Sequence, residues 1–132
     1  MRRLSLLVAA SAWLWGGAAL AVTTEDFIIA NTQDVIDVCT TPESDPMYGP
    51  AMGFCQGYLV GAYQYHAALH SGPKARPIVC LPQPTPTRSQ AIDRFIVWAK
   101  AHPEYANEKP VEALVKFLVE TYPCTQGAPA AK

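Results

Sequence analysis

The chain lacks the excess of basic residues that a nucleic-acid-binding surface needs. Its 132 residues include ten Lys and Arg against eleven Asp and Glu, which gives a formal net charge of −1. Arg2 and Arg3 lie in the leader segment described below, and without them eight basic residues remain against the same eleven acidic ones. Binding to nucleic acid requires a basic face, so we expect no nucleic-acid partner.

The sequence also lacks the short motifs of common catalytic and metal sites. It has no C-x-x-C pair, which argues against a structural zinc site, no glycine-rich phosphate loop, and no nucleophile elbow around Ser71 or Ser89. His66 and His70 are four residues apart, but no third metal ligand is near them in sequence. A solvated pair near a helix C-terminus, where positive charge is favourable, explains them. We therefore expect no enzyme activity, no metal site and no cofactor.

One long apolar run without charge is present, from Leu4 to Leu20. Arg2 and Arg3 precede this run, and Ala19-Leu20-Ala21 is a small-x-small cleavage site. Together these features predict a secretory signal peptide at residues 1–21, cleaved after Ala21. An uncleaved membrane anchor is the alternative, although the run is slightly short for a span. Cleavage would leave a mature chain outside the cytoplasm with no membrane segment.

Apolar periodicity predicts a small all-α domain over residues 22–126, followed by a disordered tail at residues 127–132. We expect four helices, near residues 32–41, 51–69, 87–101 and 107–122. Residues 22–29 would form a fifth helix or an extended arm. The expected N-caps are Thr32, Thr87 and Asn107, and Gln90 completes a capping box with Thr87. The last helix is expected to bury Val111, Leu114, Val115, Leu118 and Val119.

The predicted helix at 51–69 contains glycines at positions 53, 57 and 61, which share one helical face. Each glycine inside a helix costs roughly 1 kcal/mol relative to alanine. Three on one face therefore predict a segment packed unusually close to it. We expect Tyr58 and Tyr65 in the core, and Tyr48 and Tyr63 partly exposed.

All four cysteines, Cys39, Cys55, Cys80 and Cys124, follow the predicted cleavage site. An even number in a small exported chain indicates two disulfides. In an up-down-up-down arrangement, Cys39 and Cys55 flank one short turn, while Cys80 and Cys124 meet at the opposite pole. This geometry predicts the pairs Cys39–Cys55 and Cys80–Cys124. The alternative is Cys39–Cys124 with Cys55–Cys80.

The order of these residues resembles a known family. The pattern comprises Cys39, Phe54-Cys55-Gln56-Gly57-Tyr58-x-x-Gly61, Val79-Cys80-Leu81-Pro82, Val97-Trp98, His102-Pro103, Ala113-Leu114 and Tyr122-Pro123-Cys124. It is similar to the Rap/Tai-type immunity proteins of bacterial type VI secretion systems, from about residue 32 to residue 124. The shared residues are mainly cysteines, glycines and helix-end prolines, which specify a fold.

The resemblance implies a periplasmic, disulfide-bonded, often homodimeric protein that binds a cognate protein toxin. In the Tai-type branch, the toxin is a peptidoglycan amidase whose active site is occluded by a loop of the inhibitor. We expect the loops at 40–50 and 71–86 to make such contacts, with Met47, Tyr48, Lys74 and Arg76 as candidate partner-binding residues. The alternatives are a periplasmic stress protein or chaperone resembling HdeA, and another periplasmic binding or structural role.

Overall fold

The computed structural model describes residues 22–124, which form four α-helices and two 3-10 helices with no strand among them. The elements are η1 (Thr24–Phe27), α1 (Thr32–Cys39), α2 (Tyr48–Leu69), α3 (Arg88–Ala101), η2 (Pro103–Tyr105) and α4 (Pro110–Thr121). The predicted all-α fold of four helices is confirmed. The predicted signal peptide at 1–21 and tail at 127–132 lie outside the described residues.

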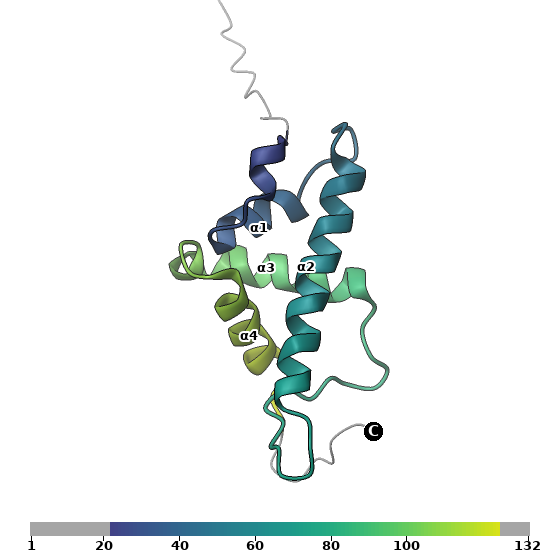
Figure 1. The fold of residues 1–132 in the computed structure, drawn as a ribbon, viewed down its shortest axis with the longest axis vertical. Coiled ribbons are helices and arrows are strands. Elements are labelled where there is room, and N and C mark those ends of the chain that lie inside the picture. Colours follow the sequence, from purple (N-terminus) through teal and green to yellow (C-terminus); the bar gives the residue numbers. More distant parts are fainter. Residues whose placement is uncertain (1–21, 125–132) are drawn as a thin grey trace, which may run out of the picture.

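The longest helix, α2, runs along the long axis of the molecule, and each of the four α-helices contacts the other three. Figure 1 shows α3 crossing α2 steeply, with α1 and α4 packed beside α2 on one side. The helices therefore do not form the up-down-up-down bundle expected from the sequence. Within residues 22–124, no helix combines the length and apolar character needed to cross a membrane.

Side-chain caps fix where two of the helices begin. The Thr87–Gln90 capping box is present: Gln90 N–H donates to Thr87 Oγ1 at 3.2 Å, and Thr87 N–H donates to Gln90 Oε1 at 3.0 Å. Helix α1 is capped by Asn31 rather than Thr32, because the Asn31 side chain accepts from Asp34 N–H at 3.1 Å. The buried Thr32 hydroxyl instead donates to the carbonyl of Glu108 at 3.0 Å, which ties α1 to the segment before α4.

Helix α2 begins at Tyr48, three residues earlier than expected. Pro50 falls in its first turn, where the missing N–H breaks no intrahelical hydrogen bond. The glycine face of α2 is open: a Cβ added at Gly53, Gly57 or Gly61 would meet no atom within 4 Å. The segment expected to pack closely on this face is therefore absent from the described chain. Tyr65, expected in the core, is 67% exposed.

The core lies where α3 and α4 pack against α1 and α2. Its largest fully buried side chain is Phe95, whose ring meets the ring of Phe117 edge-on at 5.6 Å. Burying one such aromatic side chain contributes roughly 1.5–3 kcal/mol. Because Phe117 faces this core, α4 buries Ala113, Leu114, Phe117 and Leu118, and Val111 is exposed. Leu114 and Leu118 are buried as expected, but the buried face is rotated towards Ala113 and Phe117, and Lys109, not Asn107, precedes the first residue of α4.

Two disulfides close the fold, one within the first half of α2 and one beyond its C-terminal end, and both predicted pairs are confirmed. Cys39–Cys55 joins the end of α1 to the first half of α2. Cys80–Cys124 joins the long loop between α2 and α3 to the residues that follow α4. Leu69, the last residue of α2, is 14 positions after Cys55 (69 − 55 = 14), which is about 21 Å at the helical rise, so the two bridges stabilise different parts of the domain.

Candidate functional site

The four residues expected to contact a partner lie in two separate places. Met47 and Tyr48 are half-buried at the N-terminus of α2. Lys74 and Arg76 are exposed in the loop after its C-terminus. About 33 Å of helix lies between the two pairs, so they do not form one compact site. The pole that carries Lys74 and Arg76 offers the more accessible side chains.

The loop at this pole, residues 70–87, is held at defined points. Gly72 adopts a φ of +129°, in the left-handed region that favours glycine. Beyond Lys74 and Arg76, Val79 forms an antiparallel bridge with Pro123. Cys80 N–H donates to the carbonyl of Tyr122 at 2.8 Å, beside the Cys80–Cys124 disulfide. The middle of the loop is therefore fixed to the residues that follow α4, and the two exposed cations precede that anchor.

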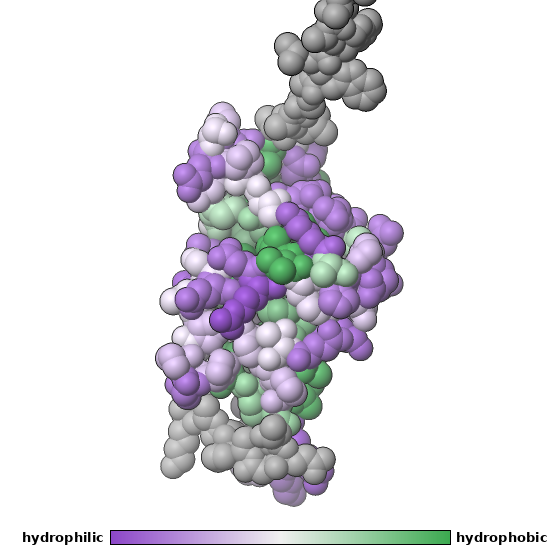
Figure 2. Space-filling model, turned by 180° about the vertical axis from the view of Figure 1, so that it is seen from behind, coloured by the Kyte–Doolittle hydropathy of each residue, from purple (hydrophilic) through white to green (hydrophobic). Residues whose placement is uncertain are grey.

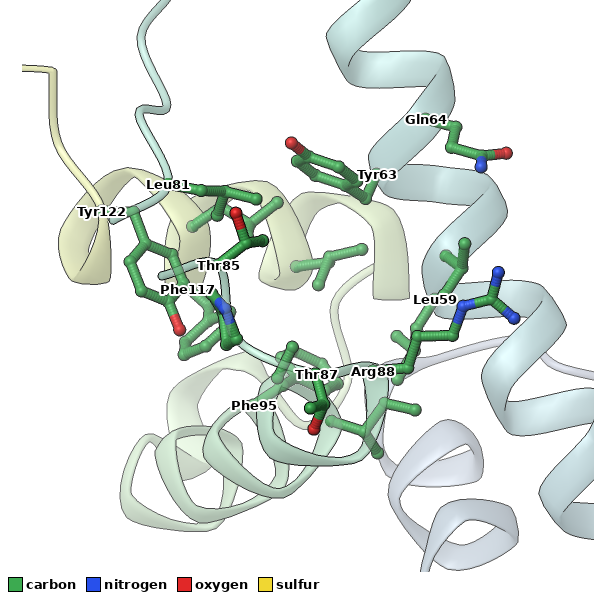
Figure 3. A pocket seen from close by; sticks show the side chains of 16 residues that line it. Leu59, Tyr63, Gln64, Leu81, Thr85, Thr87, Arg88, Phe95, Phe117 and Tyr122 are labelled. Atoms are coloured by element: carbon green, nitrogen blue, oxygen red, sulfur yellow. The ribbon is translucent and has the colours of Figure 1, made fainter. Parts of the chain in front are cut away.

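Between this anchored loop and the helices lies a half-open cavity of about 250 Å³, which we call the apolar pocket. Figure 3 shows Tyr63 pointing into it from α2, Leu81 and Thr85 from the loop, and Phe117 and Tyr122 from the C-terminal segment. Its sixteen lining residues are Leu59, Val60, Tyr63, Gln64, Leu81, Thr85, Pro86, Thr87, Arg88, Ala91, Ile92, Phe95, Leu114, Phe117, Leu118 and Tyr122.

The apolar pocket carries few polar groups, and the only charge among its lining residues is positive. Arg88 is the single charged residue among those that line it, and the lining includes no Asp or Glu. The hydroxyl of Tyr122 accepts a hydrogen bond from Arg94 Nη1 at 3.0 Å, which places a second guanidinium beside one wall. The lining contains neither a carboxylate nor a histidine that could act as a general base, so its chemistry suits binding.

His66 and His70 form a pair at the C-terminal end of α2, with ring centroids 4.3 Å apart and ring planes tilted by 31°. His70 Nδ1 lies 2.9 Å from the carbonyl oxygen of His66. His66 is 8% exposed, so it is not the solvated residue expected from the sequence. Burial lowers the pKa of His66, and the neighbouring His70 lowers it further. Among residues 22–124, no cluster of three or more His, Cys, Asp or Glu side chains could hold a metal ion.

An aromatic stack lies at the end of α3, and its Trp98 ring also packs on Phe117, which lines the apolar pocket. The Trp98 ring stacks on His102 at 4.4 Å and on Tyr105 at 5.3 Å. Trp98 Nε1 donates to Glu120 Oε2 at 2.9 Å, which ties α3 to α4. A shallow depression beside the stack is lined by Glu104, Tyr105, Glu108, Glu112 and Lys116. These contacts give the His102-Pro103 corner a structural role.

Sequence reasoning identified the proline-rich loop but missed the pocket beneath it. The five prolines between 73 and 86 indicated a long, pinned segment. The pocket depends on which side chains of α2, α3 and α4 meet under that segment, and apolar periodicity does not specify this. Arg88 was overlooked because it lies beside the capping residue Thr87, where a charged side chain is usually solvated.

The domain is thus a disulfide-stapled, all-α binding scaffold, and a comparison with family models gives its family. Residues 31–124 match the model of the Rap1a immunity proteins. The match covers well over half of the chain, so the protein belongs to the Rap1a immunity protein family, in agreement with the resemblance drawn from its motifs. Neither the curated proteins nor the solved structures gave a significant match.

Proposed function

We propose that this immunity-type protein acts in the periplasm, where it neutralises a cognate antibacterial toxin by binding it and occluding its active site. The family match over residues 31–124 is the observation that carries the proposal. In this account catalysis belongs to the toxin, and the protein contributes steric exclusion. A type VI secretion system would deliver the toxin, and a peptidoglycan amidase is the toxin class we favour.

The pole formed by loop 70–87 is the contact surface we propose. Lys74 and Arg76 are exposed there, while the Cys80–Cys124 bridge and the hydrogen bond from Cys80 N–H to Tyr122 restrain the loop. A restrained loop loses little conformational entropy on binding, which favours affinity. Two exposed cations also favour a toxin surface of negative charge.

The opposite pole supplies a second, smaller candidate surface. Met47 and Tyr48 are half-buried, and Met47 N–H donates to Asp45 Oδ1 at 2.7 Å. A stable complex buries about 800 Å² on each partner. An interface of that size can be centred on either pole, and we assign it to loop 70–87 because Lys74 and Arg76 are exposed whereas Met47 and Tyr48 are half-buried.

Growth under toxin export tests the function. Cells that export the hydrolase encoded by a neighbouring gene into their periplasm should lyse, and co-export of this protein should restore growth. A leaderless version kept in the cytoplasm is the matched control and should give no protection. Lysis that continues at normal levels of the exported, oxidised protein would refute the proposal.

A further inference from the structure

The apolar pocket is larger than the voids that protein interiors normally contain. Interiors are close-packed, with few voids larger than one water molecule, whose share of liquid volume is about 30 Å³. The pocket measures about 250 Å³, and aromatic and aliphatic side chains such as Phe95, Phe117 and Leu114 line it. Half-open, mostly apolar pockets are the usual sites at which proteins bind small molecules. Filling this pocket with apolar groups is therefore favourable.

The charge beside the pocket selects an anionic ligand. In Figure 3 the Arg88 side chain extends towards the Leu59 side of α2. Arg88 is exposed, and none of the other residues that line the pocket carries a carboxylate. Arg94 is held at the Tyr122 wall by its 3.0 Å hydrogen bond to the tyrosine hydroxyl. An anion at the Arg88 side of the rim would thus meet a guanidinium group, which binds carboxylates with well-matched geometry.

We propose that this pocket binds a small amphipathic monocarboxylate, with its acyl chain among the apolar side chains and its carboxylate at Arg88. The proposal is independent of toxin binding. The shape supports a small ligand over a protein surface, because the walls come from α2, α3, α4 and loop 70–87 and form a concave site. Small-molecule sites are concave and mostly apolar with a few polar groups, whereas a protein partner needs a broader surface.

A chain-length series tests the pocket by calorimetry with the purified, oxidised protein. Hexanoate, octanoate and decanoate are titrated below their micelle-forming concentrations. Each added methylene that enters the pocket should lower Kd roughly fourfold, until the chain fills the space and the gain stops. Nonyltrimethylammonium has the same nine-carbon alkyl chain with the opposite charge, and it should bind at least about fivefold more weakly than decanoate.

Substitutions in α3 test whether the ligand binds in the apolar pocket. Ala91→Leu fills the pocket, and Arg88→Gln removes the charge at its rim. Ala91→Leu should weaken decanoate at least about tenfold, by excluding several methylenes. Arg88→Gln should weaken decanoate about fivefold while leaving the ammonium compound unchanged or tighter. Lys100→Gln, exposed in the last turn of the same helix, is the control and should bind decanoate normally.

Each contrary outcome is decisive. An absence of saturable carboxylate binding, or equal affinity for the ammonium compound, would overturn the proposal. If the Ala91→Leu variant folds and still binds decanoate normally, the ligand lies outside the apolar pocket. If Ala91→Leu does not fold, Arg88→Gln still decides, because Arg88 is exposed. If the protein does not bind decanoate, and if Ala91→Leu weakens binding of the toxin, the pocket is part of the toxin-binding surface instead.

Discussion

The backbone N–H of Cys80 donates to the carbonyl oxygen of Tyr122 at 2.8 Å, two residues before the disulfide partner of Cys80, Cys124. This relationship fixes the middle of loop 70–87 to the end of α4. It also positions the proline-rich segment that lines the apolar pocket, since Leu81 follows Cys80 directly. One anchor therefore shapes both the exposed loop that we assign to the toxin and the pocket that we assign to a carboxylate.

The two disulfides should stabilise the domain unequally. Cys80–Cys124 closes a loop of 44 residues and Cys39–Cys55 one of 16 residues. Loop entropy then gives about 4 kcal/mol for the first and about 3 kcal/mol for the second. Urea unfolding of the two paired Cys→Ala variants measures this. A larger loss for the Cys39–Cys55 pair would contradict the entropy account.

Phe95 should carry more of the folding energy than any exposed apolar residue of α3. It is 1% exposed, so Phe95→Ala removes buried surface and leaves a cavity, which should cost about 3–5 kcal/mol. Val97, on the same helix, is 71% exposed, and Val97→Ala should change stability by about 0.5 kcal/mol or less. Chemical denaturation compares the two, and similar losses would mean that Phe95 is not central to the core.

Alanine on the open glycine face of α2 should raise the stability of the free protein. A Cβ at Gly57 would meet nothing within 4 Å, so Gly57→Ala should raise the free energy of unfolding by about 0.5–1 kcal/mol. Gly72→Ala is the matched control: its φ of +129° strains any side chain, and it should lose about 1 kcal/mol or more. A loss for Gly57→Ala, measured by thermal unfolding, would show that something packs on this face.

Stability should decrease as the pH falls because of His66. Burial, and then His70, lower the pKa of His66 below the ordinary histidine value of 6.5. The unfolded chain therefore takes up a proton at a higher pH than the folded chain, and stability that is complete above about pH 6.5 is lost below it. Urea midpoints at pH 7.5 and pH 5.5 measure the loss. His66→Gln should reduce the difference and His102→Gln should keep it; an unchanged difference in His66→Gln would exclude His66 as the cause.

Local signals in the sequence were sufficient for the helices and the disulfides. The Thr87–Gln90 capping box is a local hydrogen-bond pattern, and it marks the start of α3 correctly. The positions of the loops predict the cysteine pairs. These pairs are correct even though α3 crosses α2 steeply, because the loops that carry the paired cysteines still lie at the same poles of the domain. Asn31, not Thr32, caps α1 because the Thr32 hydroxyl bonds to Glu108, a partner 76 positions away that no local pattern identifies.

The contact surfaces were harder to predict, because they depend on how helix faces meet. Periodicity placed Leu114 and Leu118 correctly on the buried face of α4 but missed Phe117, which the contact with Phe95 turns into the core. The glycines of α2 suggested close packing, yet their face is open. Met47 and Tyr48 were grouped with Lys74 and Arg76 on loop composition alone, and only the length of α2 reveals how far apart the two pairs are.

Calorimetry tests the central claim most directly. The oxidised protein is titrated with the secreted hydrolase encoded by a neighbouring gene, and the activity of the hydrolase is followed in parallel. The account predicts nanomolar binding with loss of hydrolase activity, and weaker binding when Lys74 and Arg76 are both changed to glutamate. An absence of binding by correctly disulfide-bonded protein would contradict the proposed immunity function.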